Sequence, residues 1–376
     1  MKYINMILII GLVLTLMFSG CVQSNETDTI KIGAVLGLTG SGSYLSEYMK
    51  KGFDLAQMEI NNTGNYKIEI IYEDSYSNNE GAVKATSKLI NYDNVNLILG
   101  PHRSGSVLSV ADILNENKVI AIAPLATSPD ITNAGDYIFR NRETGETHGK
   151  LLSEYLLKNN YNKIAVIYAN ASNSIGYKNS FIKNYTDNNG EVIIELNYLE
   201  DQIDFSSEIT KILSKDPSAI YISSTLGIDG GRIVKELGTA GFKGQIFGTM
   251  LFETQDFLDM ADSFSENVIF TTMPYDNTLE HVKTFEDKYS KTYTDPMHPA
   301  AANAYDALMI FANAINFCES DNSECVKNYL YSMNPYLGVG GLTAFDSNGD
   351  VIFKTPLLKT IKNNQFVKYE WYYDKH

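Results

Sequence analysis

The stretch Ile30-Lys-Ile-Gly-Ala-Val-Leu36, continued by Gly37 and Leu38-Thr-Gly-Ser-Gly-Ser43, contains the pattern that decides the fold. An apolar run of strand length leads into a turn rich in glycine and serine. Apolar residues then recur at helical spacing, at Leu45, Met49, Phe53, Ala56 and Ile60. A strand, a glycine-rich turn and an amphipathic helix in this order predict the start of a parallel α/β sheet.

The same alternation continues to about residue 140. The pattern predicts strands at 67–72, 95–99 and 119–123, and helices around 82–92 and 104–114. Apolar strands separated by helices are typical of a parallel sheet that is covered on both faces.

The alternation restarts after Phe139-Arg-Asn-Arg-Glu-Thr144, with no linker of low complexity. The expected helices lie at 146–157, 175–186, 205–213 and 230–240. The expected strands lie at 163–168, 191–199, 219–223, 246–248 and 267–271. This is a second α/β unit of similar size.

The C-terminal part changes pattern, which indicates that the chain returns to domains already built. Helices at 280–289, 299–317 and 325–331 precede four strand-like runs that end at Tyr373. We therefore expect two doubly wound parallel-sheet lobes joined by several hinge crossings. Lobe 1 would comprise 30–143 plus 274–345, and lobe 2 would comprise 144–273 plus 346–376. Two lobes joined in this way hinge around a cleft.

The N-terminal block resembles a lipoprotein signal. Lys2 precedes an apolar run at 7–18, and Ser19, Gly20 and Cys21 follow. A basic start, a short apolar region and small residues before a cleavage point are typical of secretory signals. Residues 1–21 would be the signal with its lipidated Cys21, and 22–29 a flexible tether. The alternative is an uncleaved N-terminal anchor with an incidental cysteine.

If the first interpretation holds, the protein works outside the cytoplasm, attached to the outer face of the cell membrane through Cys21. The net charge of −15 argues against a nucleic-acid partner, since little would neutralise phosphates. We also expect no cofactor, and no metal at the scattered histidines His102, His148, His281, His298 and His376.

Two cysteines remain in the body of the chain, Cys318 and Cys325, with six residues between them. In an exported protein this pair predicts a local disulfide that closes a loop between two helices. A metal site is the alternative, but no histidine lies near.

The usual catalytic motifs are missing, so we do not expect an enzyme. A hydrolase with an unmarked carboxylate pair would leave no motif, and it has no positive support.

The segments that follow strands are where open α/β sheets bind ligands. Gly100-Pro-His-Arg-Ser-Gly-Ser106 follows one strand, and a helix begins at Ser104. Ala123-Pro-Leu-Ala-Thr-Ser-Pro-Asp130 follows the next strand, with Thr127 as a hydroxyl donor and Ser128-Pro129 as a helix start. The two loops, with hydroxyls and free amides, would converge on one anion. Ser104 as a plain N-cap is the alternative.

Three other patterns have simpler explanations. Asp346-Ser-Asn-Gly-Asp350 faintly resembles a calcium loop, but Asn-Gly between strand-like runs predicts a hairpin turn. Gly227-Ile-Asp-Gly-Gly231 could hold a phosphate or simply form a strand-to-helix turn. Arg140 and Arg142 could clamp an anion at the lobe junction or, as surface residues, pair with Glu143 or Glu146.

Taken together, several stretches resemble the extracytoplasmic solute-binding proteins of the leucine/isoleucine/valine-binding family, of periplasmic-binding fold type I. The likeness covers nearly all of the chain after the signal. It rests on Lys31-Ile-Gly-Ala-Val-Leu-Gly-Leu-Thr-Gly40, Leu97-Ile-Leu-Gly100 with Ser104, Ile122-Ala-Pro-Leu-Ala-Thr127, Asp204-Phe205, and Gly341-Leu-Thr-Ala-Phe-Asp346 with Gly349.

The resemblance implies a receptor that closes two lobes over a small solute and delivers it to the permease subunits of an ABC transporter. A serine and an Ala-Ala-Thr-like loop hold the ligand carboxylate in that family. Here they correspond to Ser104 and to Leu125, Ala126 and Thr127.

The second lobe departs from the family. The family's acidic residue that binds the ligand ammonium corresponds to a position at or near Met250 in this chain. The family's cleft tyrosines correspond to positions near Ile175 and Thr225. Glu253, Asp229 or Tyr177 could compensate, because a buried ammonium without a carboxylate is costly. A hydrophobic or aromatic carboxylate is therefore as plausible a ligand as an amino acid. Its apolar walls would be Tyr44, Leu45, Met250, Leu251 and Phe252, although the last three could be ordinary packing.

We therefore expect a receptor for a small carboxylate, by default a branched-chain or other neutral amino acid, that acts as a monomer. A sensor that reports to a separate partner is one rival. An enzyme on the same scaffold is the other.

Overall fold

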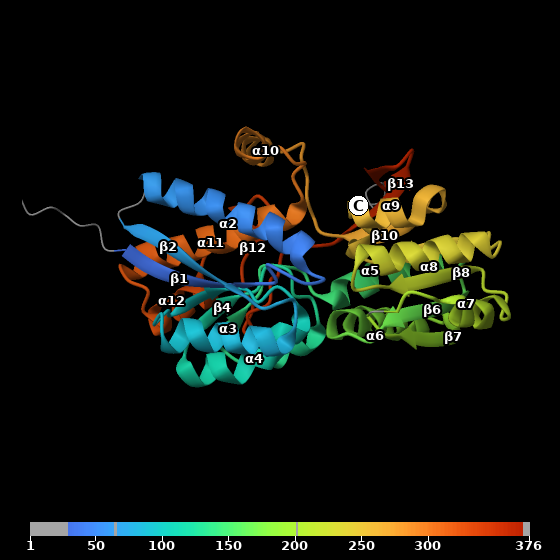
Figure 1. Cartoon of the computed structure of the whole chain (residues 1–376), viewed down its shortest axis with the longest axis horizontal. Helices are drawn as coiled ribbons and strands as arrows, with labels where there is room; N and C mark the ends of the chain where they lie inside the picture. The colour runs from blue at the N-terminus through green and yellow to red at the C-terminus, as the bar shows by residue number, and fades with distance from the viewer. Residues whose placement is uncertain (1–28, 64–65, 201, 371–376) are drawn as a thin grey trace, which may run out of the picture.

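Two α/β lobes lie end to end, each built on its own β-sheet (Figure 1). The computed structural model describes residues 29–63, 66–200 and 202–370. The predicted signal with Cys21, tether residues 22–28 and the end of the last strand-like run at Tyr373 lie outside these residues. Within the described ranges, no helix has both the length and the apolar character needed to cross a membrane.

The first lobe contains a parallel five-stranded sheet in the order β2-β1-β3-β4-β5. Its strands are β1 (Thr29–Leu36), β2 (Lys67–Asp74), β3 (Leu97–Leu99), β4 (Ile120–Ile122) and β5 (Ile138–Phe139). Helices α3 (Asn79–Asn91) and α4 (Ser104–Asn117) cover one face. Helices α2 (Ser43–Thr63) and α11 (Pro299–Cys318) cover the other.

The inner strand β1 shows why the apolar run at 30–36 decides this architecture. Ile32, Ala34 and Leu36 pack in the core beneath α2 and α11. Val35 points the opposite way, into the core beneath α3 and α4. Because both faces are buried, both sets of alternating residues must be apolar.

The second lobe contains a seven-stranded sheet in the order β14-β13-β10-β9-β8-β6-β7. Its strands are β6 (Lys163–Ala169), β7 (Glu191–Tyr198), β8 (Ala219–Ser223), β9 (Gln245–Gly248), β10 (Ile269–Thr272), β13 (Leu357–Lys362) and β14 (Gln365–Lys368). Helices α5 (Gly145–Lys158) and α6 (Ser172–Asp187) pack on one face. Helices α7 (Ser206–Leu213), α8 (Gly227–Thr239) and α9 (Gln255–Ala261) pack on the other. The two doubly wound lobes confirm the predicted fold class, with β13 and β14 added in antiparallel orientation.

The C-terminal part serves both lobes, as its change of pattern indicated. Helices α10 (Glu280–Thr292) and α12 (Ser323–Ser332) join the core of the first lobe, beside the hairpin β11 (Tyr336–Gly338) and β12 (Gly341–Thr343). The chain then returns to the second sheet. The exact lobe boundaries predicted from the sequence stay a prediction. At the junction, two crossing segments lie side by side, since the Arg140 amide donates to the Gly349 carbonyl.

Three helices begin three residues before their predicted starts, namely α3 at Asn79, α6 at Ser172 and α8 at Gly227. Apart from Ile228, their extra first turns contain small and polar residues, which carry no helical periodicity. Local caps stabilise two of them: the Asn78 side chain accepts from the Gly81 amide, and Asp229 accepts from the Leu226 amide.

Two loop predictions fall on described residues. Cys318 and Cys325 form a disulfide with an S–S distance of 2.08 Å, which closes the turn between α11 and α12. Asp346–Asp350 is a turn, with Gly349 at a φ of 78° and its amide bonded to the Asp346 carbonyl, which confirms the hairpin prediction. In the described part of the chain, no group of three or more His, Cys, Asp or Glu could hold a metal.

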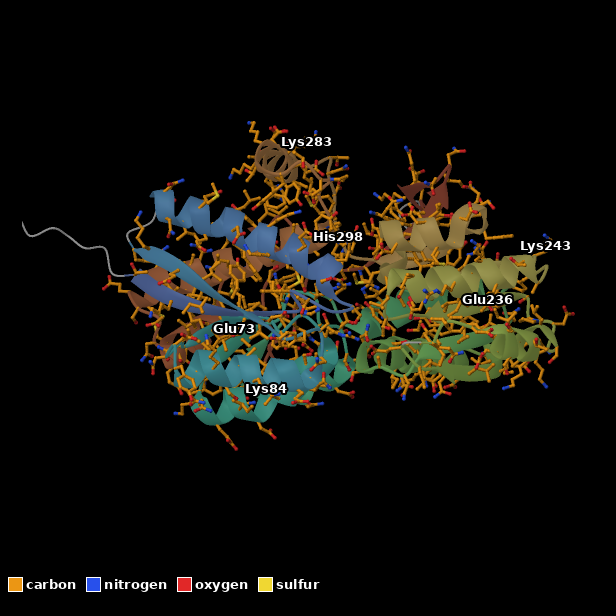
Figure 2. All side chains as sticks on the ribbon, viewed as in Figure 1. Glu73, Lys84, Glu236, Lys243, Lys283 and His298 are labelled. Atoms are coloured by element: carbon orange, nitrogen blue, oxygen red, sulfur yellow. A yellow bond between two sulfur atoms is a disulfide. The ribbon has the colours of Figure 1, made fainter. Side chains whose placement is uncertain are left out.

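Side chains fill the space between the layers of both lobes (Figure 2). Lys84 and Lys283 project outward from the helices of the first lobe, as their exposure requires. His298 is buried instead. Its Nδ1 accepts from the Ala300 amide at the start of α11, and its Nε2 lies 3.2 Å from the Glu253 carbonyl of the second lobe. It therefore forms one of the contacts between the lobes.

Candidate functional site

A cavity lies between the two lobes and encloses about 840 Å³ of empty space, part of it open to solvent. Every segment that lines it follows the carboxyl end of a parallel strand, where ligand sites of open α/β sheets form. The lining residues are Ser41, Gly42, Tyr44, Leu45, His102, Arg103, Ser104, Leu125, Thr127, Asn173, Tyr177, Thr225, Leu226, Gly227, Ile228, Met250, Leu251, Thr254 and Asp256.

Ser104 joins the two loops that the sequence predicted to converge. Its Oγ accepts the amide hydrogens of Thr127 and Ser128, each at 3.1 Å. Because two bonds occupy its lone pairs, the Ser104 hydroxyl proton is left to donate. Ser104 does not cap α4, since Arg103 is the N-cap residue and makes no side-chain cap bond. The plain N-cap alternative is therefore wrong, whereas Ser128 caps the short helix at Pro129 as expected.

Most of the predicted binding residues lie together in this cavity. Those that line it are Tyr44, Leu45, Ser104, Leu125, Thr127, Thr225 and Met250. Ala126 is buried and is not among the lining residues. Ile175 faces a separate hollow beside Glu200. Leu251 lines the cavity, whereas Phe252 stacks on Phe257 with ring centroids 4.1 Å apart, so packing accounts for it.

The proposed substitutes for an acidic residue lie in different places. Glu253 pairs with Lys359 and Thr272, outside the lining. Asp229 is also outside it; burial raises its pKa to about 6, against bonds from Tyr198 and nearby amides that lower it. Tyr177 does line the cavity. Among the described lining residues, Asp256 alone carries a carboxylate, and it is exposed.

His102 is a lining residue that the sequence interpretation missed, although it lies within the loop singled out at 100–106. Its Nδ1 accepts the Gly37 amide hydrogen at 3.3 Å. Burial, assisted by the charge of Arg103, lowers the pKa of His102 to about 3. The ring is therefore neutral at physiological pH.

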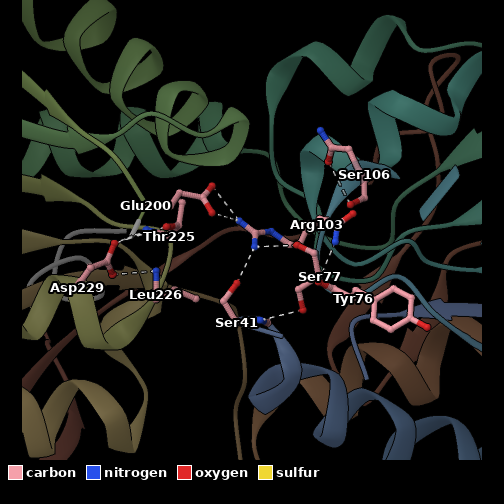
Figure 3. A network of polar contacts seen from close by, with 12 residues as sticks. Ser41, Tyr76, Ser77, Arg103, Ser106, Glu200, Thr225, Leu226 and Asp229 are labelled. Carbon is pink, nitrogen blue, oxygen red and sulfur yellow. Dashed lines mark hydrogen bonds and ion pairs between the residues drawn. The ribbon is translucent and has the colours of Figure 1, made fainter. Parts of the chain in front are cut away.

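Arg103 reaches from the first lobe to the second (Figure 3). Its Nη1 donates to Ser41 Oγ at 3.3 Å and to the Ser77 carbonyl at 3.2 Å. Its Nη2 faces the carboxylate of Glu200, which follows β7. No local pattern in the sequence indicates this pairing, because the partners belong to different lobes.

The arginines of the lobe junction are buried, which corrects the expectation of surface residues. Arg140 pairs with Asp350 and also donates to Thr132 and to the Ser128 carbonyl. Arg142 pairs with Glu143 at 3.2 Å, as one alternative proposed, and neither arginine lines the cavity. Burial alone would raise the pKa of Glu143, but the charge of Arg142 and a bond from His148 lower it to about 2.

The Gly227–Gly231 turn serves packing. Gly227 opens α8, and a Cβ placed on it would lie 1.9 Å from Thr254 Oγ1. Glycine is therefore required there for close approach of the second-lobe segments that line the cavity.

The chain is similar to known proteins along almost its whole described length. The family model described as periplasmic binding protein matches residues 29–359. A Leu/Ile/Val-binding protein homolog of Brucella melitensis is 26% identical over 86% of this chain and 88% of its own length.

Two solved structures also resemble it. One is the leucine-binding protein LivK of Thermotoga maritima, with a TM-score of 0.86, 24% identity, and coverage of 90% of this chain and 97% of that chain. The other is the branched-chain amino acid binding protein LivJ of Streptococcus pneumoniae in complex with isoleucine. Its TM-score is 0.82, its identity 29%, and its coverage 91% of this chain and 100% of that chain.

Proposed function

The chain belongs to the periplasmic binding protein family, and we propose that it is the extracytoplasmic receptor of an ABC importer for a small carboxylate. The default ligand is a branched-chain or other neutral amino acid. Lobe closure over the inter-lobe cavity would bind the solute, without chemistry on it.

The Ser104 corner of the cavity carries this proposal. The Ser104 hydroxyl, the Thr127 hydroxyl and the first amides of α4 are donors gathered at the ends of neighbouring strands. Such a set suits a carboxylate, because the positive end of the α4 dipole adds to the hydrogen bonds. The relatives named for leucine, isoleucine and valine support the amino-acid version.

A second candidate is a hydrophobic or aromatic carboxylate without an ammonium group. It is favoured by the second-lobe wall, where Ile228, Met250 and Leu251 present apolar side chains and no buried carboxylate is among the described lining residues. An ammonium group would have only the exposed Asp256 as an anionic partner.

Native mass spectrometry of the purified protein, followed by calorimetry on the co-purifying solute, tests both versions. The amino-acid version expects saturable micromolar or tighter binding of leucine, isoleucine or valine. Ser104→Ala with Thr127→Ala should abolish it, whereas Ser109→Ala with Thr210→Ala, outside the cavity, should not. Binding of plain carboxylates alone would favour the second candidate, and binding of neither class would refute the receptor. Recovery of chemically altered solute would favour an enzyme.

We also propose that Cys21 is lipidated, that the receptor acts as a monomer and that it serves permease subunits. Cys21→Ser should release the protein from the membrane fraction, and light scattering should give the monomer mass. Co-purification with a signalling protein instead of a permease would favour the sensor.

A further inference from the structure

The cavity has a second polar corner, formed by His102 and the first turn of α2. Gly42, Tyr44, Leu45 and His102 all line the cavity. A Cβ placed on Gly42 would lie 2.7 Å from His102 Nε2. The edge of the imidazole that carries Nε2 therefore faces the start of α2.

The hydrogen bond at the other ring nitrogen determines the tautomer of His102. The Gly37 amide hydrogen is shared between Ser46 Oγ at 3.2 Å and His102 Nδ1 at 3.3 Å, so Nδ1 acts as an acceptor and carries no proton. A neutral imidazole with an accepting Nδ1 must hold its proton on Nε2. Nε2 is thus a donor, and it is buried with no hydrogen-bond partner among the described residues. Buried donors normally have an acceptor, so this one needs an explanation.

The neighbouring hydroxyl of Ser77 does not accept from Nε2 and bonds to other groups. Ser77 Oγ lies beside the same glycine, but it accepts the Gly42 amide hydrogen at 3.0 Å and donates to the Thr39 carbonyl at 2.8 Å. Ser43, the first residue of α2, donates its amide to the Gly40 carbonyl, but the amides of Tyr44 and Leu45 in the same turn have no intrahelical partner and are also donors. Donors from the ring and the helix start, together with the helix dipole, favour an oxygen atom at this corner.

We propose that His102 is a specificity-determining residue whose Nε2–H donates to an oxygen of the ligand. The receptor would then prefer small carboxylates that carry a second acceptor, such as a hydroxyl or carbonyl oxygen, over purely aliphatic ones. This inference rests on the proposed function, because it assigns the carboxylate itself to the Ser104 corner.

Valine and threonine provide a matched pair, since threonine replaces one methyl group with a hydroxyl at nearly constant volume. Calorimetry on the purified protein should show threonine binding at least tenfold tighter than valine. His102→Leu should remove this preference by weakening threonine binding, with valine binding unchanged or improved. His102→Gln keeps an N–H donor and should retain most of the preference. Thermal unfolding checks that both variants are folded.

Other outcomes separate the inference from the function on which it rests. A threonine-to-valine affinity ratio equal in the wild type and His102→Leu would overturn the inference and leave the receptor intact. If neither amino acid binds, 3-hydroxybutanoate and 3-methylbutanoate repeat the comparison for plain carboxylates. If none of the four binds although leucine or isoleucine does, the inference is overturned and the receptor stands. If none of these ligands binds, the proposed function fails, and the inference fails with it.

The tautomer can be checked without any ligand. Nitrogen-15 NMR of the histidine rings should show His102 neutral and protonated at Nε2 at pH 7, with assignment by loss of the signal in His102→Gln. A proton on Nδ1 would overturn the inference directly.

Discussion

Arg103 of the first lobe and Glu200 of the second form an ion pair across the cleft. Arg103 Nη2 donates to both carboxylate oxygens of Glu200, at 3.0 Å to Oε1 and 2.8 Å to Oε2. Arg103 immediately precedes Ser104 and lines the cavity. Because the partners sit on different lobes, the pair requires the lobes to be as close together as they are here.

Glu200→Gln should therefore weaken ligand binding by favouring the open form. Both side chains are partly exposed, at 21% and 31%, so the pair contributes at most about 1 kcal/mol, or about fivefold in Kd. Surface plasmon resonance should show the loss mainly as faster dissociation, and it should shrink at high salt. Asp187→Asn, which breaks the exposed pair with Lys183 inside one lobe, is the control. Equal dissociation rates for wild type and Glu200→Gln would show that the Arg103–Glu200 pair does not stabilise the closed form.

Asp350→Asn should destabilise the lobe junction by about 3–5 kcal/mol, because it leaves the fully buried Arg140 guanidinium without its carboxylate. Urea unfolding measures this loss. Lys84→Ala removes an exposed pair with Glu80 and should leave the urea midpoint close to that of the wild type. A similarly small effect of Asp350→Asn would show that the junction tolerates the unpaired charge.

Replacement of both Cys318 and Cys325 by serine should lower the free energy of unfolding by about 2 kcal/mol, since the bond closes only a short loop. Ligand affinity should not change, because neither cysteine lines the cavity. In the Cys21→Ser protein, which has no third cysteine, the mass without reduction should be unaffected by alkylation under denaturing conditions. Two alkylated thiols would refute the bond.

Stability should fall as the pH drops below about 6.5. Burial lowers the pKa of His298 to about 4, against the nearby Glu253, which raises it, and His102 is lowered to about 3. Between these values and the ordinary 6.5, the unfolded chain binds protons that the folded chain does not. Each histidine therefore stabilises the fold above pH 6.5, and this contribution is lost progressively toward pH 4 and pH 3, at up to about 1.4 kcal/mol per pH unit.

Urea midpoints between pH 7.5 and pH 4.5 measure this slope. His298→Asn keeps an acceptor for the Ala300 amide but cannot titrate, so its slope should be shallower. Parallel slopes for the variant and the wild type would contradict the assignment to His298.

The sequence by itself determined the two α/β lobes and the edge where a site would form. Periodicity is a local property, so the buried strand β1 and the amphipathic helix after it were predictable from adjacent residues. The meeting of Ser104 with Thr127 followed from the rule that neighbouring parallel strands end at the same edge.

Only the tertiary structure decided which charges meet and which polar atoms stay unpaired. Arg140 and Asp350 are 210 residues apart, and Arg103 finds Glu200 only across the cleft. His102 Nε2 is left as an unpaired donor among the described residues because Gly37, at the end of another strand, donates its amide to Nδ1 of the same ring. Such pairings depend on distances set by the packing of whole lobes, and these distances leave no periodic signal in the chain.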